Sequence, residues 1–400
     1  MRYEPCSLLQ QSEYFLADAY DAKCMQSPLN FVRQLAARFD RGWWQPVPAA
    51  RLAPFLVYVD TERPFHQLPV ELDDPALVQS FRYYNNAPQQ AYVYHIRQRT
   101  LLEPVYGYGV WGMRGIVPES MPYWYHVGYP SFAAYVLHRK LRSVQREHAV
   151  ISLHEFGDDN YYHFYGDVLG KLALLEEHGV GADLPVVLSA RLANKPYFRA
   201  AIARSAQFCA RRWIVQDQQY IDADEVIVCK TLPHRKRTFD ALLDLLHVPP
   251  AEPHINNRIF LTRSLRRGRF ISNAADVARV CGEYGFEAID ADRLSLDEQI
   301  ACFGRARYVV GIHGAGLTNT IFRRGAPLSL LELFPPDNLP PHYWWLAQNY
   351  GFGYDALVGH ASAVTGPFTV DTDLLRAKLH RLLHENPALQ RQPDPAHVVR

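Results

Sequence analysis

The sequence predicts an α/β fold with two doubly wound lobes, and two observations lead to this prediction. From residue 149 onward, short apolar runs typical of buried strands alternate with segments whose apolar residues recur at helical spacing. The segment 247–257 then interrupts this alternation with three prolines and little periodicity, as a hinge between two lobes would. The length of 400 residues agrees, because a chain of this size rarely folds around one core.

The first lobe shows strand-like runs with helical segments between them. Gly179 follows the first helical segment and suits a helix C-terminus. Residues 92–115 look like short strands and turns, and the rest of 1–140 is irregular and rich in proline and aromatic residues. The alternation predicts a parallel sheet. The predicted strands are 149–156, 184–188 and 225–231, and the predicted helices cover 162–175 and 196–207.

The second lobe alternates more regularly. Asn273 is a favoured residue at a helix start, and Ser295 with Glu298 three residues later forms a capping-box pattern. Gly285 suits the end of the helix that begins after Asn273. These signals predict a doubly wound sheet of about five strands. The predicted strands are 258–264, 286–290, 307–312, 328–334 and 354–359, and the predicted helices are 274–284, 296–306, 317–324, 342–351 and 373–385.

Composition argues against several classes of protein. The net charge is +1, so no overall field attracts the chain to nucleic acid or to an acidic membrane. The six cysteines form no C-x-x-C pair, which argues against a zinc site or a redox motif and fits a reducing compartment. The first residues lack the basic start and apolar stretch of a signal peptide, and no apolar run approaches the ~20 residues of a membrane helix. We therefore expect a cytoplasmic protein.

The sharpest chemical signal is ARYVVGIHGAGLTNTIFRRG, residues 306–325, where a buried strand turns into a short helix through three glycines. Glycine permits positive φ and close backbone approach. Amides at a helix start, together with the helix dipole, attract anions, and a diphosphate is the obvious guest. His313 would add a hydrogen bond or a proton. The candidate binding residues are Gly314, Ala315, Gly316, Leu317, Thr318 and Asn319.

A tight strand-to-helix turn that binds no ligand would show the same glycines, and this alternative stays open. The segment does not read G-x-G-x-x-G, so the dinucleotide-binding fingerprint is not matched.

Charged residues near the ends of two predicted strands support an anion site. Arg263 ends one strand, and Arg266, Arg267 and Arg269 follow it. Ligands of open α/β sheets bind beyond the carboxyl ends of the strands, and arginine forks suit phosphate oxygens. Glu332, near the carboxyl end of another strand, could accept both ribose hydroxyls of a nucleotide. The alternatives are a solvated basic loop and a carboxylate paired with an arginine.

In order and spacing, the motifs from Arg258 to Pro335 resemble the glycosyltransferase family 61 domain, also called the DUF563 type. The matching words are RIFLTR, NAADV, YGFEAID, LSLDEQI, ARYVVGIHGAGLTNTIF and LLELFP. The segment DNYYHFYGDVLGKLALL, residues 159–175, is similar to the N-Y-x-H-x-x-x-D segment of that family. The resemblance covers roughly residues 150–335, and residues 1–140 match nothing obvious.

The resemblance implies the GT-B form of the α/β class, with two Rossmann-like lobes facing across a cleft. The expected divisions are 1–140, an irregular N-terminal region of the acceptor lobe; 141–250, the Rossmann-like acceptor lobe; 254–370, the Rossmann-like lobe that binds the nucleotide sugar; and 371–400, a C-terminal helix and tail.

The resemblance also implies a nucleotide-sugar donor, usually a UDP-sugar, inversion at the anomeric carbon, and no cofactor or obligatory metal. Arginines, the helix start and His313 would then neutralise the departing diphosphate in place of Mg²⁺. Strings of the form Asp-x-Asp would suit a metal site of another glycosyltransferase type, although so short a pattern arises easily by chance. They occur at Asp222/Asp224, Asp290/Asp292 and Asp371/Asp373.

Inverting transfer needs a base within hydrogen-bond reach of the acceptor hydroxyl. His163 and Asp167 lie four residues apart on one predicted helix face of the first lobe, so they can meet. We expect Asp167 to act as the base while His163 positions the acceptor, or the reverse. An ion pair between Asp167 and Lys171, and a structural role for His163, are the alternatives.

The function predicted from these residues is inverting, metal-independent transfer of a sugar to a glycan or lipid-linked glycan acceptor. With no signal peptide apparent, we expect a bacterial enzyme of capsule, exopolysaccharide or O-antigen synthesis, in the cytoplasm or at the inner face of the membrane. We expect no nucleic-acid partner. Two alternatives are a catalytically silent subunit that binds nucleotide or glycan in an assembly complex, and a Rossmann-type enzyme that modifies sugar nucleotides.

Overall fold

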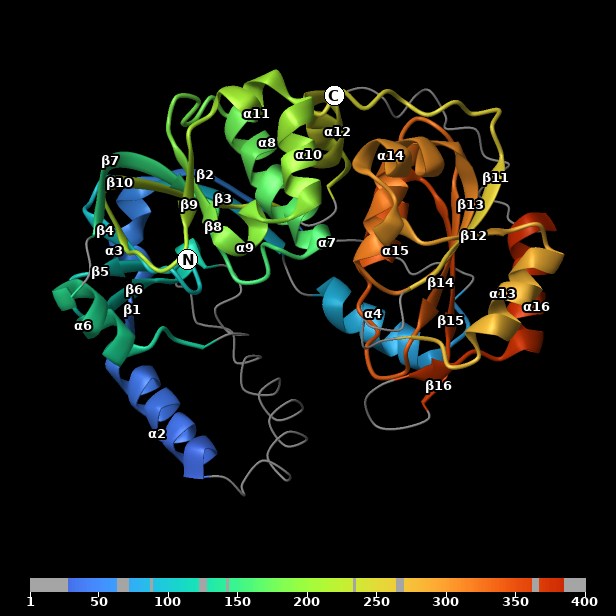
Figure 1. Ribbon diagram of the computed structural model, residues 1–400, viewed down its shortest axis with the longest axis horizontal. Helices are drawn as coiled ribbons and strands as arrows, with labels where there is room; N and C mark the ends of the chain where they lie inside the picture. The colour runs from blue at the N-terminus through green and yellow to red at the C-terminus, as the bar shows by residue number, and fades with distance from the viewer. Residues whose placement is uncertain are drawn as a thin grey trace.

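The computed structural model describes residues 28–62, 72–86, 89–121, 128–141, 144–232, 235–263, 270–361 and 367–384. Two main sheets lie side by side, with helices packed on them and between them (Figure 1). The predicted α/β class is therefore confirmed. Among the helices of the described residues, none has the length and apolar character needed to cross a membrane.

The first sheet has ten strands and is mixed. Its parallel part has the order β10-β7-β8-β9, as the alternation of the first lobe predicts. Antiparallel strands extend it, because β3 and β4 both pair with β10. The strands are β1 (Gln45–Pro46), β2 (Leu56–Glu62), β3 (Gln89–Ile96), β4 (Thr100–Leu102), β5 (Gly109–Trp111), β6 (Gly115–Val117), β7 (Gln145–Ser152), β8 (Val186–Ser189), β9 (Trp213–Gln216) and β10 (Ile221–Lys230).

The prediction of a parallel sheet is therefore too narrow for this part of the chain. The expectation of short strands and turns over 92–115 is confirmed, but these strands join the same sheet as residues 145–230 instead of forming a separate unit. Strand β9 was not predicted, because its apolar run of only three residues, 213–215, lies between charged and polar residues. The strand predicted at 149–156 runs from Gln145 to Ser152 instead; its first residues are polar and partly exposed, and residues 153–156 are not part of it.

The helical segment predicted over 162–175 runs from Tyr161 to Glu177, and Gly179 beyond it has the left-handed φ of +63°. It comprises α7 (Tyr161–His163), a π-helical turn labelled η3 (Phe164–Leu169) and α8 (Gly170–Glu177). Such π-turns are rare in helices and often occur at functional sites. The predicted helix 196–207 is interrupted at Ser205, which caps the second piece.

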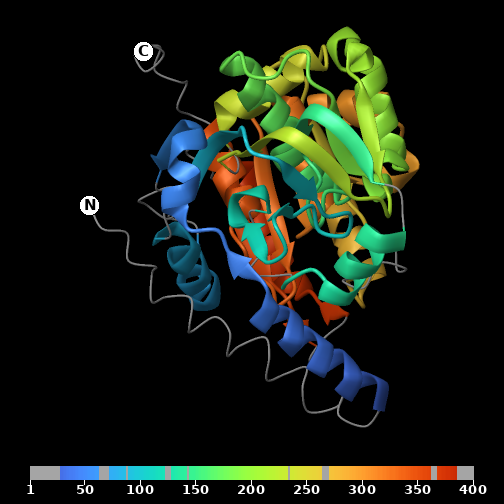
Figure 2. The same ribbon diagram turned by 90° about the vertical axis from the view of Figure 1, so that its left-hand side faces the viewer.

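The other helices of this half lie around the first sheet. In Figure 2, α2 projects from the body of the protein, and α6 lies near the end of α2 that joins the body. The elements are α2 (Pro28–Trp43), α3 (Ala49–Leu52), η1 (Ala53–Phe55), α4 (Pro75–Asn86), η2 (Pro118–Ser120), α6 (Phe132–Leu141), α9 (Ala190–Ala193), α10 (Pro196–Arg204), α11 (Ala206–Ala210) and α12 (Lys236–Leu245).

The second sheet is fully parallel, with five strands in the order β12-β11-β13-β14-β15, as predicted. Helices α14 and α15 cover the face toward the first sheet, and α13 and α16 cover the opposite face (Figure 1). The elements are β11 (Asn257–Leu261), α13 (Ala274–Glu283), β12 (Glu287–Ile289), η4 (Ala291–Arg293), α14 (Leu296–Arg305), β13 (Ala306–Ile312), η5 (Ala315–Arg323), β14 (Ser329–Phe334), α15 (His342–Tyr350), β15 (Gly353–Val358), β16 (His360–Ala361), β17 (Phe368–Thr369) and α16 (Thr372–His384).

Two of the three helix-end signals act as predicted here. Ser295 and Glu298 form the full capping box of α14, and Gly285 follows α13 with a φ of +76°. Asn273 is the N-cap residue of α13, as expected, but its side chain makes no capping bond. Instead its Nδ2 donates to the carbonyl of Val370 at 2.9 Å, and its Oδ1 accepts from the amide of Val370 at 3.0 Å. The asparagine thus fastens the start of α13 to the segment before α16.

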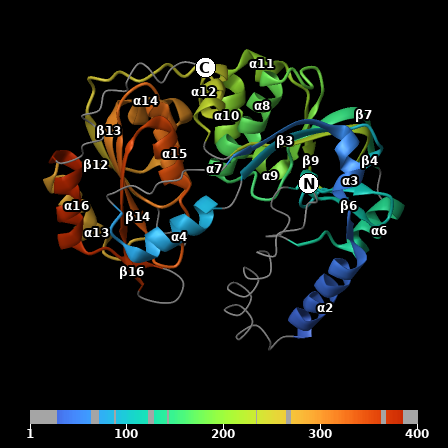
Figure 3. The same ribbon diagram turned by 180° about the vertical axis from the view of Figure 1, so that it is seen from behind.

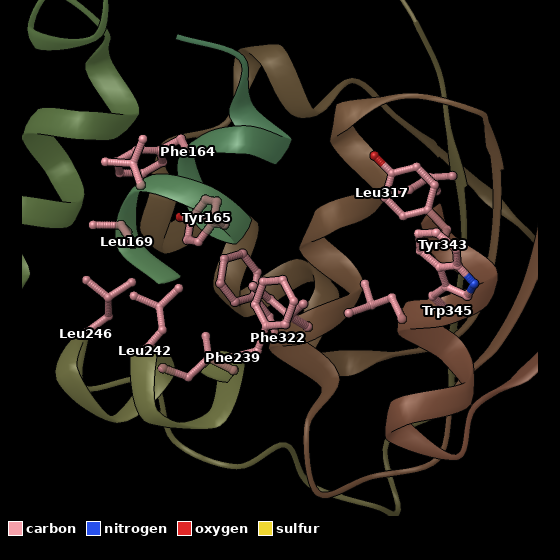
Figure 4. Packing of buried hydrophobic residues seen from close by; sticks show 14 of the residues in the cluster. Phe164, Tyr165, Leu169, Phe239, Leu242, Leu246, Leu317, Phe322, Tyr343 and Trp345 are labelled. Atoms are coloured by element: carbon pink, nitrogen blue, oxygen red, sulfur yellow. The ribbon is translucent and has the colours of Figure 1, made fainter. Parts of the chain in front are cut away.

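The two sheets share one hydrophobic core. Phe164, Tyr165 and Leu169 from the first half meet Phe322 from the second, with the rings of Tyr165 and Phe322 6.0 Å apart at 81° (Figure 4). Seen from behind, α4 lies beside the second sheet (Figure 3). There Phe81 packs 5.4 Å from the ring of Trp344. This apolar contact sets the relative position of the sheets.

The predicted connection 247–257 lies between α12 and β11 and is held in place by side chains of η5. Arg323, which is fully buried, donates from Nη2 to the carbonyl of Ile255 at 2.7 Å. Arg324, the residue after η5, donates from Nη2 to the carbonyl of Val248 at 2.5 Å. Carbonyls that leave regular structure thereby keep their hydrogen bonds.

Candidate functional site

The strand order of the second sheet changes direction between β11 and β13. From β11 the chain passes through α13 to β12 on one side, then through α14 to β13 on the other side. A crevice therefore opens beyond the carboxyl ends of β11 and β13, where doubly wound sheets bind ligands. Arg263 follows β11, and His313 with Gly314 follows β13. Two of the predicted signals thus meet at this switch point.

The glycines at the end of β13 and the start of η5 are required for space. The expectation that they adopt positive φ is wrong. Gly314 has a φ of 162°, which is extended, and the positive-φ glycines of the described chain include neither Gly311 nor Gly316. A Cβ on Gly311 would lie 2.7 Å from Cδ2 of Leu317, and one on Gly316 would lie 3.0 Å from Cδ2 of Leu261. The missing side chains let the start of η5 pack directly against the strands.

The candidate residues of η5 divide into two groups. Ala315 and Gly316 begin the helix, where amides lack intrahelical acceptors, and both line a cavity of about 730 Å³. Leu317 and Thr318 are buried, at 0% and 1% exposed. Thr318, a candidate binding residue, does not line this cavity, and its binding role stays a prediction. Leu317 packs in the shared core.

Arg263 lies against the glycine bend. Its Nη1 donates to the carbonyl of His313 at 3.3 Å, and a Cβ on Gly314 would lie only 2.7 Å from that same Nη1. A cation and the first amides of η5 are thus concentrated at one end of the sheet, which suits an anion. Arg267, which we also expected to bind phosphate, lies outside the described residues.

His313 is part of a buried hydrogen-bonded chain. Its Nδ1 lies 2.5 Å from Oε1 of Glu332, and the hydroxyl of Tyr354 donates to Oε2 of Glu332 at 2.6 Å. Burial raises the pKa of Glu332 well above its ordinary value, although the bond from Tyr354 opposes this. The expected ribose-binding role of Glu332 is therefore wrong: the residue is fully buried and both oxygens are engaged. Glu332 instead orients His313, so a proton from His313 to a ligand would come from Nε2.

A second histidine–carboxylate pair lies on the helical segment 161–177 of the first half. His163 Nδ1 lies 2.6 Å from Oδ2 of Asp167. The His163 side chain is 33% exposed and that of Asp167 only 7%, so the histidine is the more accessible partner. Burial lowers the pKa of His163, but the hydrogen bond and charge of Asp167 outweigh burial and raise it overall.

Lys171 does not serve as the ion-pair partner of Asp167 that the alternative reading required. Its Nζ donates to Oε2 of Glu155 at 2.6 Å, and both side chains are buried, at 3% and 1% exposed. Burial lowers the pKa of Lys171, but the neighbouring carboxylate outweighs burial and raises it, so the amine stays charged. Lys171 follows Asp167 by four residues on the same helical segment.

Replacing Lys171 by methionine is expected to destabilise the protein by about 3–5 kcal/mol, because Glu155 would remain buried without its cation. Urea unfolding of the variant measures this loss. The double variant Glu155→Leu/Lys171→Met should recover most of the stability, since it removes both charges. A single variant within about 1 kcal/mol of the wild type would contradict a buried ion pair.

Aromatic side chains connect the two histidine–carboxylate pairs. The ring of Tyr162 lies 5.4 Å from that of His163 and 5.3 Å from that of His342, and His342 lies 6.2 Å from His313. Burial and the neighbouring histidines lower the pKa of His342 to about 3, which keeps it neutral. The two pairs thus face a common region where α7 meets the start of α15.

Tyr161 connects the first half of the chain to the second half at the edge of the cavity. Its hydroxyl lies 2.6 Å from Oδ1 of Asn319 and 3.0 Å from Oε1 of Gln299, and Nδ2 of Asn319 donates to Oε1 of Gln299 at 2.8 Å. The Asn319 amide therefore links the two halves of the chain. Asn319 also lines the cavity, and its role as a ligand donor stays a prediction. The cavity is also lined by Asp159, Lys195, Tyr197, Asp292 and Ser295.

Sequence reasoning missed three residues of this region. His342 and Tyr354 were predicted only as parts of a helix and a strand, and Tyr161 was not among the candidate site residues. The available signal was their neighbours: Tyr161 precedes His163 by two residues, and Tyr354 lies in the strand next to Glu332. Nothing in the spacing of His342 identifies it, because its position depends on how the sheets pack.

The Asp-x-Asp strings have structural roles in the described part of the chain. Asp222 accepts from Nε of Arg99 at 2.8 Å, Asp290 caps η4, and Asp371 accepts from the amides at the start of α16. Within the described residues, no group of three or more His, Cys, Asp or Glu side chains is arranged to hold a metal ion.

The second sheet thus places an arginine and a glycine bend at its switch point, an arrangement that suits an anion. Residues 161–328 match the family model described as Glycosyltransferase 61. The match supports the conclusion that the protein is a transferase, which uses a sugar donor and an acceptor. The matched segment contains His163, Asp167, Arg263 and His313. No curated protein matches the sequence.

Proposed function

We propose that the protein transfers a sugar from a nucleotide sugar, of which a UDP-sugar is the first candidate, to a glycan acceptor with inversion and without a metal ion. The observation that carries the proposal is the contact between Arg263 and the glycine bend at the switch point of the second sheet. A guanidinium and helix-start amides at one place suit a diphosphate.

In this proposal the protein is a GT-B enzyme. Residues 254–370 form the donor lobe, and 141–250 with the strands of 1–140 form the acceptor lobe. The cavity beside Ala315 and Gly316 is lined from both halves of the chain, and its volume of about 730 Å³ falls in the usual range for small-molecule sites. The C-terminal helix within 371–400 belongs to the donor lobe, because α16 packs on its sheet.

The acceptor hydroxyl gives its proton to Nε2 of His163 while its oxygen attacks the anomeric carbon on the side opposite the diphosphate. The bond from the anomeric carbon to the diphosphate oxygen breaks, and its electron pair stays on that oxygen. The products are a glycoside of inverted configuration, the nucleoside diphosphate and protonated His163, which later loses its proton to solvent.

We assign the base to His163 and not to Asp167. Asp167 is the more buried of the two, and its Oδ2 is engaged by Nδ1 of His163. An accessible histidine oriented by a buried carboxylate is a familiar arrangement of a general base. The prior expectation favoured the aspartate, with the reverse left open, and the geometry supports the reverse.

The leaving diphosphate would be stabilised by Arg263 and the amides of Ala315 and Gly316, with His313 as a hydrogen-bond or proton donor. Fixed donors aimed at developing charge are the largest single contribution to catalysis in many enzymes. The product would serve synthesis of a surface polysaccharide in the cytoplasm or at the inner face of the membrane.

UDP in the presence of EDTA is expected to raise the melting temperature, because a ligand that binds only the folded state stabilises it by about 2.7 kcal/mol at a hundredfold excess over Kd. The variant Arg263→Ala should lose most of this shift. Arg279→Ala, an exposed arginine on α13, is the control and should keep it.

If UDP, GDP and CMP at saturation all leave the melting curve unmoved, the proposed donor site is wrong. Binding of UDP without donor hydrolysis or transfer to any acceptor would favour a silent binding subunit. An absorbance change of NAD in the presence of a sugar nucleotide would favour the sugar-nucleotide-modifying alternative.

A further inference from the structure

Two neighbouring loops near the proposed base hold large apolar side chains at the surface. Val105 is 51% exposed and Phe156 is 47% exposed, and Tyr106 is half-buried beside them. The rings of Tyr106 and Phe156 lie 6.3 Å apart at 45°. Together they form a small apolar patch at the surface. Unlike the other exposed aromatic pair, Tyr83 and Tyr84 on α4, this patch directly precedes Gly157, which lines the cavity.

The loop that carries Tyr106 is rigid because it is built around a buried carboxylate. Glu103, 2% exposed, accepts from the amides of Val105 at 2.8 Å and Tyr106 at 2.7 Å, and its carbonyl accepts from the amide of Gly107 at 3.1 Å. Burial raises the pKa of Glu103 to about 7, against the effect of these amides. The backbone under the exposed side chains is therefore fixed before any ligand arrives.

The second loop is locked to the first. Gly107 has a φ of +85°, and a Cβ on it would lie 2.0 Å from the carbonyl oxygen of His154, two residues before Phe156. This close approach requires glycine, and it sets the position of Phe156 relative to Tyr106.

Phe156 also lies next to the proposed base. Gly157 follows it, and a Cβ on Gly157 would lie 3.6 Å from Cδ2 of His163. Gly157 lines the cavity that reaches Ala315 and Gly316. A ring stacked on Phe156 would therefore lie next to His163 and outside the cavity proposed for the donor.

An exposed cation, Arg191, lies in α9, and the start of this helix is bonded to the loop of Phe156. Oγ of Ser189, the N-cap residue of α9, donates to Oδ1 of Asp158 at 2.7 Å. The charge of Arg191 acts on both loops, because it is among the groups that lower the pKa of Tyr106 and of Asp158 against the larger, opposite effect of burial. An exposed arginine near an aromatic surface suits a sugar that carries a carboxylate or a phosphate.

We propose that Tyr106, Phe156 and Arg191 form the acceptor subsite, and that the acceptor is a pyranoside glycan bearing a negative charge. The apolar C–H face of the ring stacks on the aromatic pair, and the anion binds Arg191. The inference rests on the proposed function, since it takes His163 as the base. Tyr106 and Phe156 lie outside the family match of 161–328, so they would distinguish this protein from others that share the matched domain.

Saturation-transfer NMR with methyl β-D-glucuronide and methyl β-D-glucoside tests the subsite on the full chain without any donor. The wild type should bind the glucuronide about tenfold more tightly than the glucoside, from one charge-assisted contact. Phe156→Ala and Tyr106→Ala should each weaken both by about five- to tenfold. Arg191→Ala should remove the preference for the glucuronide and leave glucoside binding unchanged.

Phe156→Tyr should restore binding, which distinguishes stacking from a folding defect. Phe39→Ala is the matched control, because Phe39 is 54% exposed on the distant helix α2, and it should bind as the wild type does. Absence of saturation transfer with both pyranosides, or transfer that Phe156→Ala leaves unchanged, would overturn the subsite. A preference for the glucoside would overturn the assignment of an acidic acceptor.

The outcome is separable from that of the proposed function, because neither pyranoside is a nucleotide. A UDP-induced melting shift with no pyranoside binding would leave the donor site standing and remove the acceptor subsite. Pyranoside binding without any nucleotide shift would support the subsite and overturn the donor site. Self-association through this face, seen as a concentration-dependent mass in light scattering and abolished by Phe156→Ala, would also overturn it.

Discussion

Replacing His163 by alanine is expected to lower kcat for sugar transfer by about 10²–10⁴, which is the usual contribution of a general base. The side chain is the accessible member of the pair with Asp167, on the segment that faces the switch point of the second sheet. Loss of the base affects the transition state and leaves donor binding intact. The melting shift produced by UDP should therefore be the same as in the wild type.

The control for this variant is His380→Ala, which removes a histidine from α16 on the far side of the second sheet. It should leave kcat unchanged. Transfer by His163→Ala within about threefold of the wild type would show that another group takes the proton, since loss of a general base costs far more than that.

The pH profile gives an independent test of the same pair. Because Asp167 raises the pKa of His163 above the ordinary value of 6.5, the base is protonated and inactive at low pH, and kcat/KM should rise through an inflection above 6.5. In Asp167→Asn the raising charge is absent and burial still lowers the pKa. The inflection should then move to lower pH, while the maximal rate falls because the ring loses its orientation. An unchanged inflection would mean that another group titrates.

Arg263→Ala is expected to lower kcat by about 10²–10³, the loss seen when one donor to a developing oxyanion is removed. Gly314→Ala should have an effect of similar size through the same group. The new methyl would lie 2.7 Å from Nη1 of Arg263, so the guanidinium must leave the bend. Initial-rate kinetics of both single variants measure the two losses.

The double variant Arg263→Ala/Gly314→Ala should be no slower than Arg263→Ala alone, because both changes act on one interaction. Gly282→Ala is the matched control: it lies in α13, nothing lies within 4 Å of an added Cβ, and alanine is the better helix residue. It should keep full activity. If the loss of kcat in the double variant equals the product of the two single losses, the added methyl group acts on a group other than Arg263.

The sequence predicted the second sheet well, because each of its strands is an apolar run bounded by glycine, proline or a helix cap. Local sequence alone specifies the capping box of Ser295 and Glu298, the helix end at Gly285 and the apolar strand before Gly311. In the first sheet the sequence predicted the parallel part and the short strands over 92–115, but not that they belong to one sheet. Their pairing with β10 joins segments more than a hundred residues apart, which no local pattern encodes.

The site was predicted in its local pieces and not in its assembly. The spacing of His163 and Asp167 predicts their contact, and the end of β11 predicts the position of Arg263. Which carboxylate is buried cannot be read from local spacing: Glu332 has the pattern of an accessible strand end, but Tyr354 and His313 enclose it. The contact of Tyr161 with Asn319 depends on packing between segments 158 residues apart.

The central claim is that a diphosphate binds where Arg263 meets the start of η5. A crystal structure of the protein with UDP and EDTA tests this claim most directly. We expect phosphate oxygens at about 2.7–3.2 Å from the guanidinium of Arg263 and from the amides of Ala315 and Gly316, with His163 across the cleft from the β-phosphate. A diphosphate bound away from this bend, or side chains filling it while UDP occupies another site, would contradict the account.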